Sequence, residues 1–460
     1  MSLLIRNGQI VTASDTYRAD IYCEGETITR IGPGLDVPPS AAVIDATDKL
    51  VFPGFIDPHV HIHLPFMGTY AKDTYETASQ AALVGGTTTL IEMACPARTD
   101  EPLAAFALWK SKGLGHSACD FTFHMGVTRF DPLAESQLKE IVAAGVASFK
   151  VFLAYKGAFG VEDHELYQAM RLAKQLGVIV TAHCENADAV AERQKELIAA
   201  GKTGPEWHEP SRPEAIEALG VHHLLTFAQV HGTHCYIVHT SCEPAVRQAL
   251  HARSKGASVW IETLIQYLTL DDSYAARPEF EGSKFVMSPP LRNKRNQPFL
   301  WDNLANGNIS TVATDHAPFD FHKQKEMGRG DFTRIPNGIP SLEDRVTVLY
   351  STGVATGKLD LHRFVDCAST QAARIFGLYP RKGTIRIGTD ADLVVFDPKA
   401  KWTISAKNQL MAVDYNPFEG LAVTGKPEVV TVRGEVAARN GKFVGNTRRG
   451  QFLHHQPTHF

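Results

Sequence analysis

The sequence predicts an α/β fold, a (β/α)8 TIM-like barrel with a small β-sandwich domain built from both termini. Three observations predict it. The middle of the chain alternates short apolar strands with helical patterns, as in a parallel sheet covered by helices. Both ends instead hold alternating β runs divided by turn residues. The length of 460 residues suits one barrel of roughly 250 residues or more plus a smaller domain.

The barrel strands are expected where apolar runs recur through the middle of the chain. Parallel strands are buried on both faces, so they read as nearly continuous apolar runs. We expect residues 53–379 to form the catalytic barrel and residues 1–52 and 380–460 to form the sandwich. The candidate strands are 54–59, 87–93, 120–126, 148–153, 178–183, 235–239, 257–262 and 310–314.

Helical patterns lie between these strands. Residues 162–177 place apolar side chains at helical spacing and end in Gly177, a common stop signal. Residues 211–214 read as a capping box with proline in the first turn of a helix. Residues 341–344 are predicted to open another helix.

The two ends of the chain carry turn signals. Turns are expected at Asn7-Gly8 and at Asn440-Gly441, between β runs. The residues after Gly445 follow no clear pattern. We therefore predict a mobile tail that contains His454, His455 and His459.

Bulk composition excludes several function classes. The net charge is −4 and no block of like charge occurs, so neither nucleic acid nor a membrane surface is an expected partner. No apolar run reaches the length of a membrane span, and the first residues do not resemble a signal peptide. The seven cysteines are scattered and form no CxxC pair, which suits reduced thiols and predicts a cytoplasmic location.

Residue types that bind metals lie where five of the candidate strands end. His59 and His61 stand two residues apart, so a strand would point both imidazoles to the same side. In barrels of this class, catalytic groups lie at the carboxyl ends of the strands. That position is taken by Lys150 on the fourth strand, His183 on the fifth, His239 on the sixth and Asp315 on the eighth.

Four histidines and one aspartate exceed what a single catalytic zinc needs, so two ions are plausible. A second ion requires a bridging anion, and the residue at the fourth strand is Lys150. A lysine amine that is driven neutral reacts with carbon dioxide to give a carbamate, which bridges two ions. The residues alone leave two other interpretations of Lys150 equally open: an ion pair with a substrate anion, or a Schiff base.

Longer motifs give the sequence a recognisable pattern. The chain resembles the D-hydantoinase/dihydropyrimidinase family of cyclic amidohydrolases from about residue 50 to 398, and the flanking β regions also fit. The matching stretches are PGFIDPHVHIHLPF, SFKVFLAYKG, VTAHCEN, IVHTSC, MSPPLR, ATDHAPF, IPNGIPSLEDR and GTDADLVVFDP.

The resemblance implies two divalent ions, zinc by expectation, in each protomer. It implies that Lys150 is N6-carboxylated and bridges the ions, and that Asp315 serves both as ligand and as the base that moves the proton. The implied ligands are His59 and His61 for the more buried ion, His183 and His239 for the more exposed ion, Lys150 between them, and Asp315 on the first ion.

The resemblance also implies the reaction. Two ions lower the pKa of a shared water towards roughly 7, and the resulting hydroxide attacks a ring carbonyl of a hydantoin or dihydropyrimidine. Tyr155 would donate its hydroxyl to the developing oxyanion, while Ser288 and Asn337 would hold the cyclic imide, largely through backbone groups. The product would be an N-carbamoyl amino acid.

Apolar residues near the strand ends are expected to set specificity. We predict that Leu64, Phe152 and Phe159 form a wall for the exocyclic substituent of the substrate. Core packing is an equally strong interpretation for Phe152, whereas the glycines around Phe159 favour a mobile loop. The resemblance further implies a homotetramer.

Two rival functions remain at this stage. An allantoinase or dihydroorotase is the rival among enzymes, but a dihydroorotase should present a basic pocket to its substrate carboxylate, and the residues named above are apolar. A non-catalytic dihydropyrimidinase-like scaffold is the rival of another class. Such proteins lose metal ligands, whereas this chain keeps all six expected ligand residues.

Overall fold

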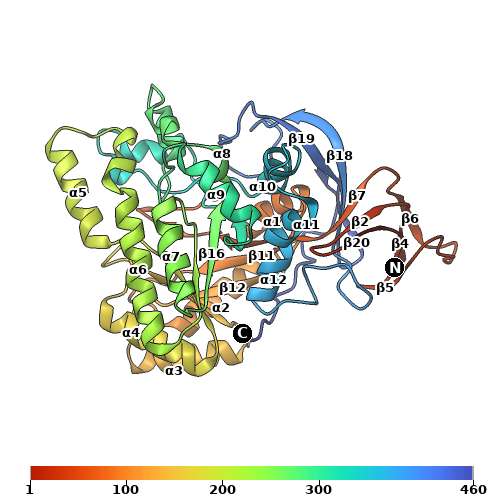
Figure 1. Cartoon of the computed structure of the whole chain (residues 1–460), viewed down its shortest axis with the longest axis horizontal. Helices are drawn as coiled ribbons and strands as arrows, with labels where there is room; N and C mark the ends of the chain where they lie inside the picture. The colour runs from red at the N-terminus through yellow and green to blue at the C-terminus, as the bar shows by residue number, and fades with distance from the viewer. Residues whose placement is uncertain (1, 458–460) are drawn as a thin grey trace.

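A computed structural model describes residues 2–457 of the chain. A body of helices wrapped around parallel strands occupies one side of the molecule, and strands from both ends of the chain lie together on the other side (Figure 1). The predicted combination of a barrel with a sheet of terminal strands is confirmed.

The barrel sheet is parallel, and in the described part of the chain it has eight strands in the order β17-β16-β15-β14-β13-β12-β11-β8. A parallel bridge between Val60 and His316, and the bond from His61 N to His316 O (2.8 Å), connect its two edges. β11 and β12 are buried along their whole length, as expected for strands covered on both faces. The strands are β8 Phe55–Val60, β11 Thr87–Ala94, β12 Asp120–Gly126, β13 Ser148–Phe152, β14 Ile179–His183, β15 Cys235–Ile237, β16 Val259–Leu264 and β17 Thr311–Ala313.

Helices connect successive strands and cover the outside of the barrel. α4 shows why: its apolar face is buried, a capping box pairs Glu162 with Glu165, and Gly177 ends it with a left-handed φ of 68°. The longer helices are α1 Tyr75–Val84, α2 Pro102–Gly113, α3 Pro132–Ala143, α4 Asp163–Leu176, α5 Ala187–Ala199, α6 Glu214–His231, α7 Glu243–Ser254 and α9 Asn296–Ala305. Shorter ones are α8 Ile265–Thr269, α10 Arg345–Leu349, α11 Leu361–Val365 and α12 Gln371–Ile375.

Two predicted helix starts differ from the structure. The capping box at Ser211 is wrong, because Ser211 belongs to the short 3-10 turn Glu209–Ser211 and its hydroxyl donates to His208 O at 2.6 Å. Pro213 disfavours helical geometry at the residue before it, so α6 begins only at Glu214. The helix expected from residue 341 begins at Arg345, whose N–H donates to Ser341 O at 3.1 Å.

The two ends of the chain meet in one sheet. Over residues 2–457 this sheet has seven strands in the order β21-β20-β19-β18-β7-β2-β3, and Val395 of β18 pairs antiparallel with Val51 of β7. A second sheet, β5-β4-β1-β6, faces it, and side chains such as Ile5 and Leu393 share one buried core. The hairpin at Asn440-Gly441 is confirmed, with φ of 51° and 76°.

The strands of these sheets are β1 Ser2–Arg6, β2 Gln9–Val11, β3 Thr16–Arg18, β4 Asp20–Glu24, β5 Thr27–Gly32, β6 Ala42–Asp45, β7 Leu50–Pro53, β18 Leu393–Thr403, β19 Ala422–Val432, β20 Glu435–Arg439 and β21 Lys442–Phe443. A small ribbon, β9 Pro65–Phe66 with β10 Thr69–Tyr70, follows β8.

The predicted mobile tail is wrong for the residues up to 457. Phe452 forms a bridge with Phe121 at the amino end of β12, and His455 is 1 % exposed. His455 Nε2 accepts from Ala147 N at 3.1 Å, and its Nδ1 donates to Phe376 O at 3.1 Å. Apolar burial and two satisfied ring nitrogens fix this segment beneath the barrel, whereas His459 lies outside the described residues.

Two further findings concern the surface and the thiols. Among residues 2–457, no helix is both long and apolar enough to cross a membrane. All seven cysteines of the sequence lie in the described part, and each is a buried free thiol.

Candidate active site and metal centre

The structure brings the predicted metal-binding residues to the carboxyl ends of the barrel strands. His59 lies in β8 and His61 directly follows it, while Lys150 lies in β13 and His183 ends β14. β13 and β14 pair so that Phe152 stands opposite His183. His239 and Asp315 each come two residues after a strand, at the ends of β15 and β17.

Three residues of the site hold left-handed backbone geometry, which residues other than glycine rarely adopt. The φ angles are 59° at Tyr155, 38° at His239 and 49° at Asp315. Such conformations cost on the order of 1–3 kcal/mol each and concentrate at functional sites. They turn these three side chains towards the pocket immediately after their strands end.

One half of the site is a compact cluster of His59, His61 and Asp315. Asp315 Oδ1 lies 3.0 Å from His59 Nε2 and 3.1 Å from His61 Nε2. All three residues are buried, and their ligand atoms lie within 4.8 Å of one another. This donor set of two imidazoles and one carboxylate suits a divalent cation of the zinc type.

The other half contains His183, His239 and Lys150. The imidazole centroids of His183 and His239 are 4.6 Å apart, and His239 lies 5.4 Å from His59. The Lys150 amine is fully buried, and its Nζ has no hydrogen-bond partner in the described structure. A buried amine without an acceptor beside four imidazoles fits a group that binds cations only after modification.

The pKa shifts agree with neutral imidazoles at His61, His183 and His239 and with an ionised Asp315. Burial lowers the pKa of His61 to about 4, and it also lowers the pKa values of His183 and His239. Burial lowers the pKa of Lys150 as well, which favours the unprotonated amine that carboxylation requires. Burial acts to raise the pKa of Asp315, but the adjacent His59 and His61 hold it well below its usual value.

His59 is the exception among the histidines. Burial acts to lower its pKa, but the carboxylates of Asp315 and Glu262 raise it overall. This imidazole therefore lies between two anions, a position that a cation would stabilise.

Two buried carboxylates behind the histidines are absent from our sequence predictions. Glu262 on β16 lies 2.7 Å from His59 Nδ1 and accepts the His239 backbone N–H at 2.8 Å. Glu185 lies 2.8 Å from His183 Nε2 and pairs with Arg212 at 2.6 Å. Carboxylates in this position fix the tautomer and orientation of metal-binding imidazoles. Their signal was in the sequence: both are acidic residues at or just after a candidate strand end.

A small pocket opens in front of His61, His183 and His239. The predicted wall residues Leu64, Phe152 and Phe159 all line it and are 6–8 % exposed. Phe66, which we did not predict, also lines the pocket, and its ring stacks on Phe159 with centroids 6.1 Å apart. The pocket therefore has one apolar side.

Its polar side gathers Tyr155, Ser288 and Asn337. Asn337 Nδ2 donates to Ser288 Oγ at 2.9 Å, and the Tyr155 hydroxyl contacts both side chains. Burial raises the pKa of Tyr155, so the phenol stays a proton donor. The structure thus places three of the predicted substrate-binding residues within one hydrogen-bonded group.

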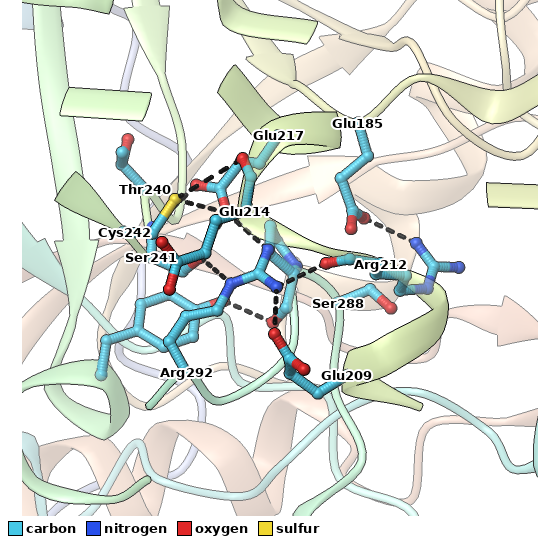
Figure 2. A network of polar contacts seen from close by, with 12 residues as sticks. Glu185, Glu209, Arg212, Glu214, Glu217, Thr240, Ser241, Cys242, Ser288 and Arg292 are labelled. Atoms are coloured by element: carbon cyan, nitrogen blue, oxygen red, sulfur yellow. Dashed lines mark hydrogen bonds and ion pairs between the residues drawn. The ribbon is translucent and has the colours of Figure 1, made fainter. Parts of the chain in front are cut away.

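Figure 2 shows a polar network that supports the end of β15. Arg292 Nε donates to Ser241 Oγ at 2.9 Å, and Arg292 Nη2 pairs with Glu217 of α6 at 2.9 Å. Arg292 also donates to the backbone carbonyl of Arg212. The guanidinium of Arg212 in turn donates to Glu185. The network joins the segment after His239 to the segment that orients His183.

Comparisons with known proteins identify the family of this chain. Residues 50–437 match the model of the amidohydrolase family. The chain is 47 % identical to a D-hydantoinase of Geobacillus stearothermophilus over 98 % of this chain and 96 % of that protein. It is 39 % identical to a dihydropyrimidinase of Rattus norvegicus over 99 % of this chain and 89 % of that protein.

A solved structure gives the same result for the fold. The D-hydantoinase (dihydropyrimidinase) from Thermus sp. superimposes with a TM-score of 0.98 and 60 % identity, covering 100 % of both chains. The match covers the whole of this chain, and so its barrel and its terminal sheets. The chain belongs to the amidohydrolase family, and within it to the D-hydantoinases and dihydropyrimidinases.

Proposed function

We propose that this protein opens the ring of cyclic amides, namely 5-substituted hydantoins and dihydropyrimidines, to give N-carbamoyl amino acids. One observation carries the proposal: His61, His183, His239, Lys150 and Asp315, from the ends of five barrel strands, line a pocket with one polar and one apolar side, and His59 lies behind them in contact with Asp315. The names of the relatives support the same class of substrate.

We further propose that the site holds two zinc ions. His59, His61 and Asp315 form the cluster for one ion, and the second would take His183 and His239. Lys150, carboxylated on Nζ, would be shared by both, which agrees with its burial and its lack of a hydrogen-bond partner. When bound, the two ions supply hydroxide near neutral pH and polarise the ring carbonyl.

The residues of the chain then perform the remaining steps. Tyr155 donates its hydroxyl to the oxyanion that forms at the attacked carbonyl. Asp315 accepts the proton of the nucleophile and passes it to the leaving ring nitrogen. Ser288 and Asn337 hold the opposite imide edge of the ring, and the apolar wall excludes water and holds the exocyclic substituent.

Turnover of a substrate panel tests the reaction. Zinc-loaded protein is assayed with dihydrouracil, with 5-substituted hydantoins of both hands, with allantoin and with dihydroorotate. We expect ring opening of hydantoins and dihydrouracil, and little or no turnover of dihydroorotate, because no basic side chain lines the pocket apart from Lys150 and the histidines. Exclusive turnover of allantoin or dihydroorotate would show that the substrate assignment is wrong.

Metal and mass analysis test the centre and separate an enzyme from a scaffold. We expect two ions per protomer, and a Lys150 peptide heavier by the mass of one carbon dioxide under conditions that preserve the carbamate. A protein with less than about one ion per protomer and no turnover on any of these substrates would instead support the non-catalytic scaffold.

We also propose a homotetramer located in the cytoplasm. The seven buried free thiols suit a reducing compartment. Leu219 and Val230 on α6 are 48 % and 64 % exposed, which suits contact with another copy of the chain. Light scattering coupled to size exclusion measures the assembly, and a monomeric mass at micromolar concentration would contradict it.

A further inference from the structure

Lys325 is a buried lysine next to the pocket. It begins the 3-10 turn Lys325–Gly328 in the segment that follows Asp315, and its relative exposure is 0 %. Its Nζ donates three hydrogen bonds, to Val286 O at 2.8 Å, Pro336 O at 2.7 Å and Gly338 O at 2.7 Å.

These three carbonyls belong to the two segments that carry the polar side of the pocket. Val286 stands two residues before Ser288, and Pro336 and Gly338 flank Asn337. We call residues 286–288 and 336–338 the imide-binding segments. They are joined by Gly338 N to Val286 O at 3.0 Å and by Asn337 Nδ2 to Ser288 Oγ at 2.9 Å, and Lys325 bonds to both.

The donors of the Lys325 ammonium group equal its acceptors in number. An ammonium group has three N–H donors and no acceptor, and here three carbonyl oxygens surround it at 2.7–2.8 Å. Burial lowers the pKa of Lys325, and the three carbonyl dipoles partly compensate the buried charge. Loss of the amine would leave three carbonyls without this donor in an interior where unpaired acceptors are costly.

The second imide-binding segment has little room to shift. Gly338 lines the pocket and holds a φ of 150°, and a Cβ on it would lie 2.3 Å from Ala317 O, two residues after Asp315. The backbone of this segment is therefore pressed against the end of the eighth strand. A small displacement of it would move Asn337 relative to the metal-binding residues.

We propose that Lys325 is a positioning residue that holds Ser288 and Asn337 at the spacing required to bind the imide edge of the substrate ring. This inference rests on the proposed function, because it assumes that these two residues bind a cyclic imide. Lys325 contacts the backbone of the imide-binding segments, so it acts through them.

The test compares two lysine variants. Lys325→Met keeps the aliphatic chain and removes the donors. Its matched control is Lys284→Met, because Lys284 stands two residues before Val286 and its Nζ instead pairs with Glu281 at 2.5 Å. We expect Lys325→Met to raise KM for hydantoin or dihydrouracil about tenfold or more and to change kcat less than about threefold, since the lost contacts act on bound ring and transition state alike. Lys284→Met should match the wild type in both.

Hydrogen exchange gives a readout that does not depend on turnover. Backbone amides in peptides spanning residues 284–290 and 335–342 should exchange faster in Lys325→Met than in wild type, with zinc content unchanged, and Lys284→Met should show no change in 335–342. Lys325→Gln, which keeps one amide donor, should lie between wild type and Lys325→Met, and it decides by the same criteria if the methionine variant does not fold.

The outcomes separate the two proposals. Unchanged KM in both Lys325 variants, or unchanged exchange in the imide-binding segments, would overturn the role of Lys325. A fall in kcat at constant KM would also overturn it. If the wild type opens no cyclic amide, the proposed function fails, and the substrate-positioning role of Lys325 falls with it even if exchange shows that Lys325 holds the two segments.

Discussion

Individual carboxylates behind the histidines determine how the proposed metal-binding imidazoles are held. Glu262 accepts a hydrogen bond from Nδ1 of His59, and this leaves Nε2 directed towards Asp315. Glu185 accepts a hydrogen bond from Nε2 of His183, which leaves Nδ1 of that ring available to bind an ion. Each carboxylate therefore selects the ring nitrogen that remains available as a ligand.

Glu262→Gln should weaken zinc binding about 10- to 100-fold, because a neutral amide makes the His59 nitrogen less basic and fixes its tautomer less firmly. Competition with a chromophoric chelator measures the affinity. Glu140→Gln on the exposed side of α3 is the control and should bind zinc as the wild type does. Equal affinity in both variants would show that Glu262 has only a packing role.

Tyr155→Phe should lower kcat by a factor of about 10² to 10³ with a smaller change in KM, because the hydroxyl is needed where charge develops in the transition state. Zinc content should stay at the wild-type level. Tyr167→Phe, at an exposed position on α4, is the matched control. A Tyr155→Phe variant that keeps wild-type kcat would remove Tyr155 from the oxyanion site.

Site residues could be predicted from the sequence where they lie at the end of a recognisable strand. His59, His183 and Asp315 are polar residues at the ends of apolar strands, a local and visible signal. The contact between His59 and Glu262 joins residues 203 positions apart and exists only after the barrel closes. Lys325 could not be predicted either, because its partners are backbone carbonyls that no side-chain pattern reveals.

At the scale of elements, the turn after β13 builds one wall of the pocket. The N–H groups of Ala158, Phe159 and Gly160 all donate to Tyr155 O within 3.0–3.1 Å, which makes the turn compact. The ring of Phe159 then packs 5.6 Å from Phe152 and is 8 % exposed. The turn therefore presents Tyr155, the proposed oxyanion donor, together with the apolar wall.

Phe159→Ala should change the preference among 5-substituted hydantoins by about tenfold while changing turnover of unsubstituted hydantoin much less, since only the substituent meets the wall. Ratios of kcat/KM across a series of alkyl and aryl substituents measure this. Phe299→Ala on α9, where the ring lies under Arg247 away from the pocket, is the control. An unchanged order of preference would assign Phe159 to packing alone.

Elements with strong periodicity could be predicted, and those set by tertiary contacts could not. The candidate strand 120–126 coincides with β12, and the helix predicted over 162–177 is α4, Asp163–Leu176. The motif at Ser211 failed because Pro213 restricts the preceding residue and competes with the capping signal. Five-residue helices such as α8 and α11 are too short to show a period.

At the scale of the whole molecule, the C-terminal segment closes the end of the barrel opposite the pocket. Phe452 packs against Phe106, Phe121 and Phe123, and the His455 ring bonds to the backbone at Ala147 and at Phe376, which belong to two separate segments. A local pattern could not predict this, because the segment has no period of its own and is fixed only by the barrel that it covers.

His455 makes stability depend on pH. Burial lowers the pKa of His455 to about 4, below its usual 6.5. As pH falls from 6.5 towards 4, the unfolded chain binds a proton that the folded chain does not, so stability falls. Between pH 7 and pH 5 this residue should cost about 2 kcal/mol of unfolding free energy.

Urea unfolding at pH 7 and pH 5 checks this value. The wild type should lose more stability on acidification than His455→Gln does, by about 2 kcal/mol. His164→Gln, at an exposed position on α4, should lose as much as the wild type. An equal loss in wild type and His455→Gln would show that His455 titrates normally in the folded protein.

The buried thiols offer a way to see whether the molecule opens in one step or in two. Cys23 lies in β4 of the terminal sheets, whereas the other six cysteines lie between residues 95 and 367. Since all are shielded in the folded chain, each reacts with an alkylating reagent only when its surroundings unfold. Pulsed alkylation in rising urea, followed by peptide mass analysis, should modify Cys23 at a different urea concentration from the others if the terminal sheets and the barrel unfold as separate units. Simultaneous modification would mean that the terminal sheets and the barrel unfold in a single cooperative transition.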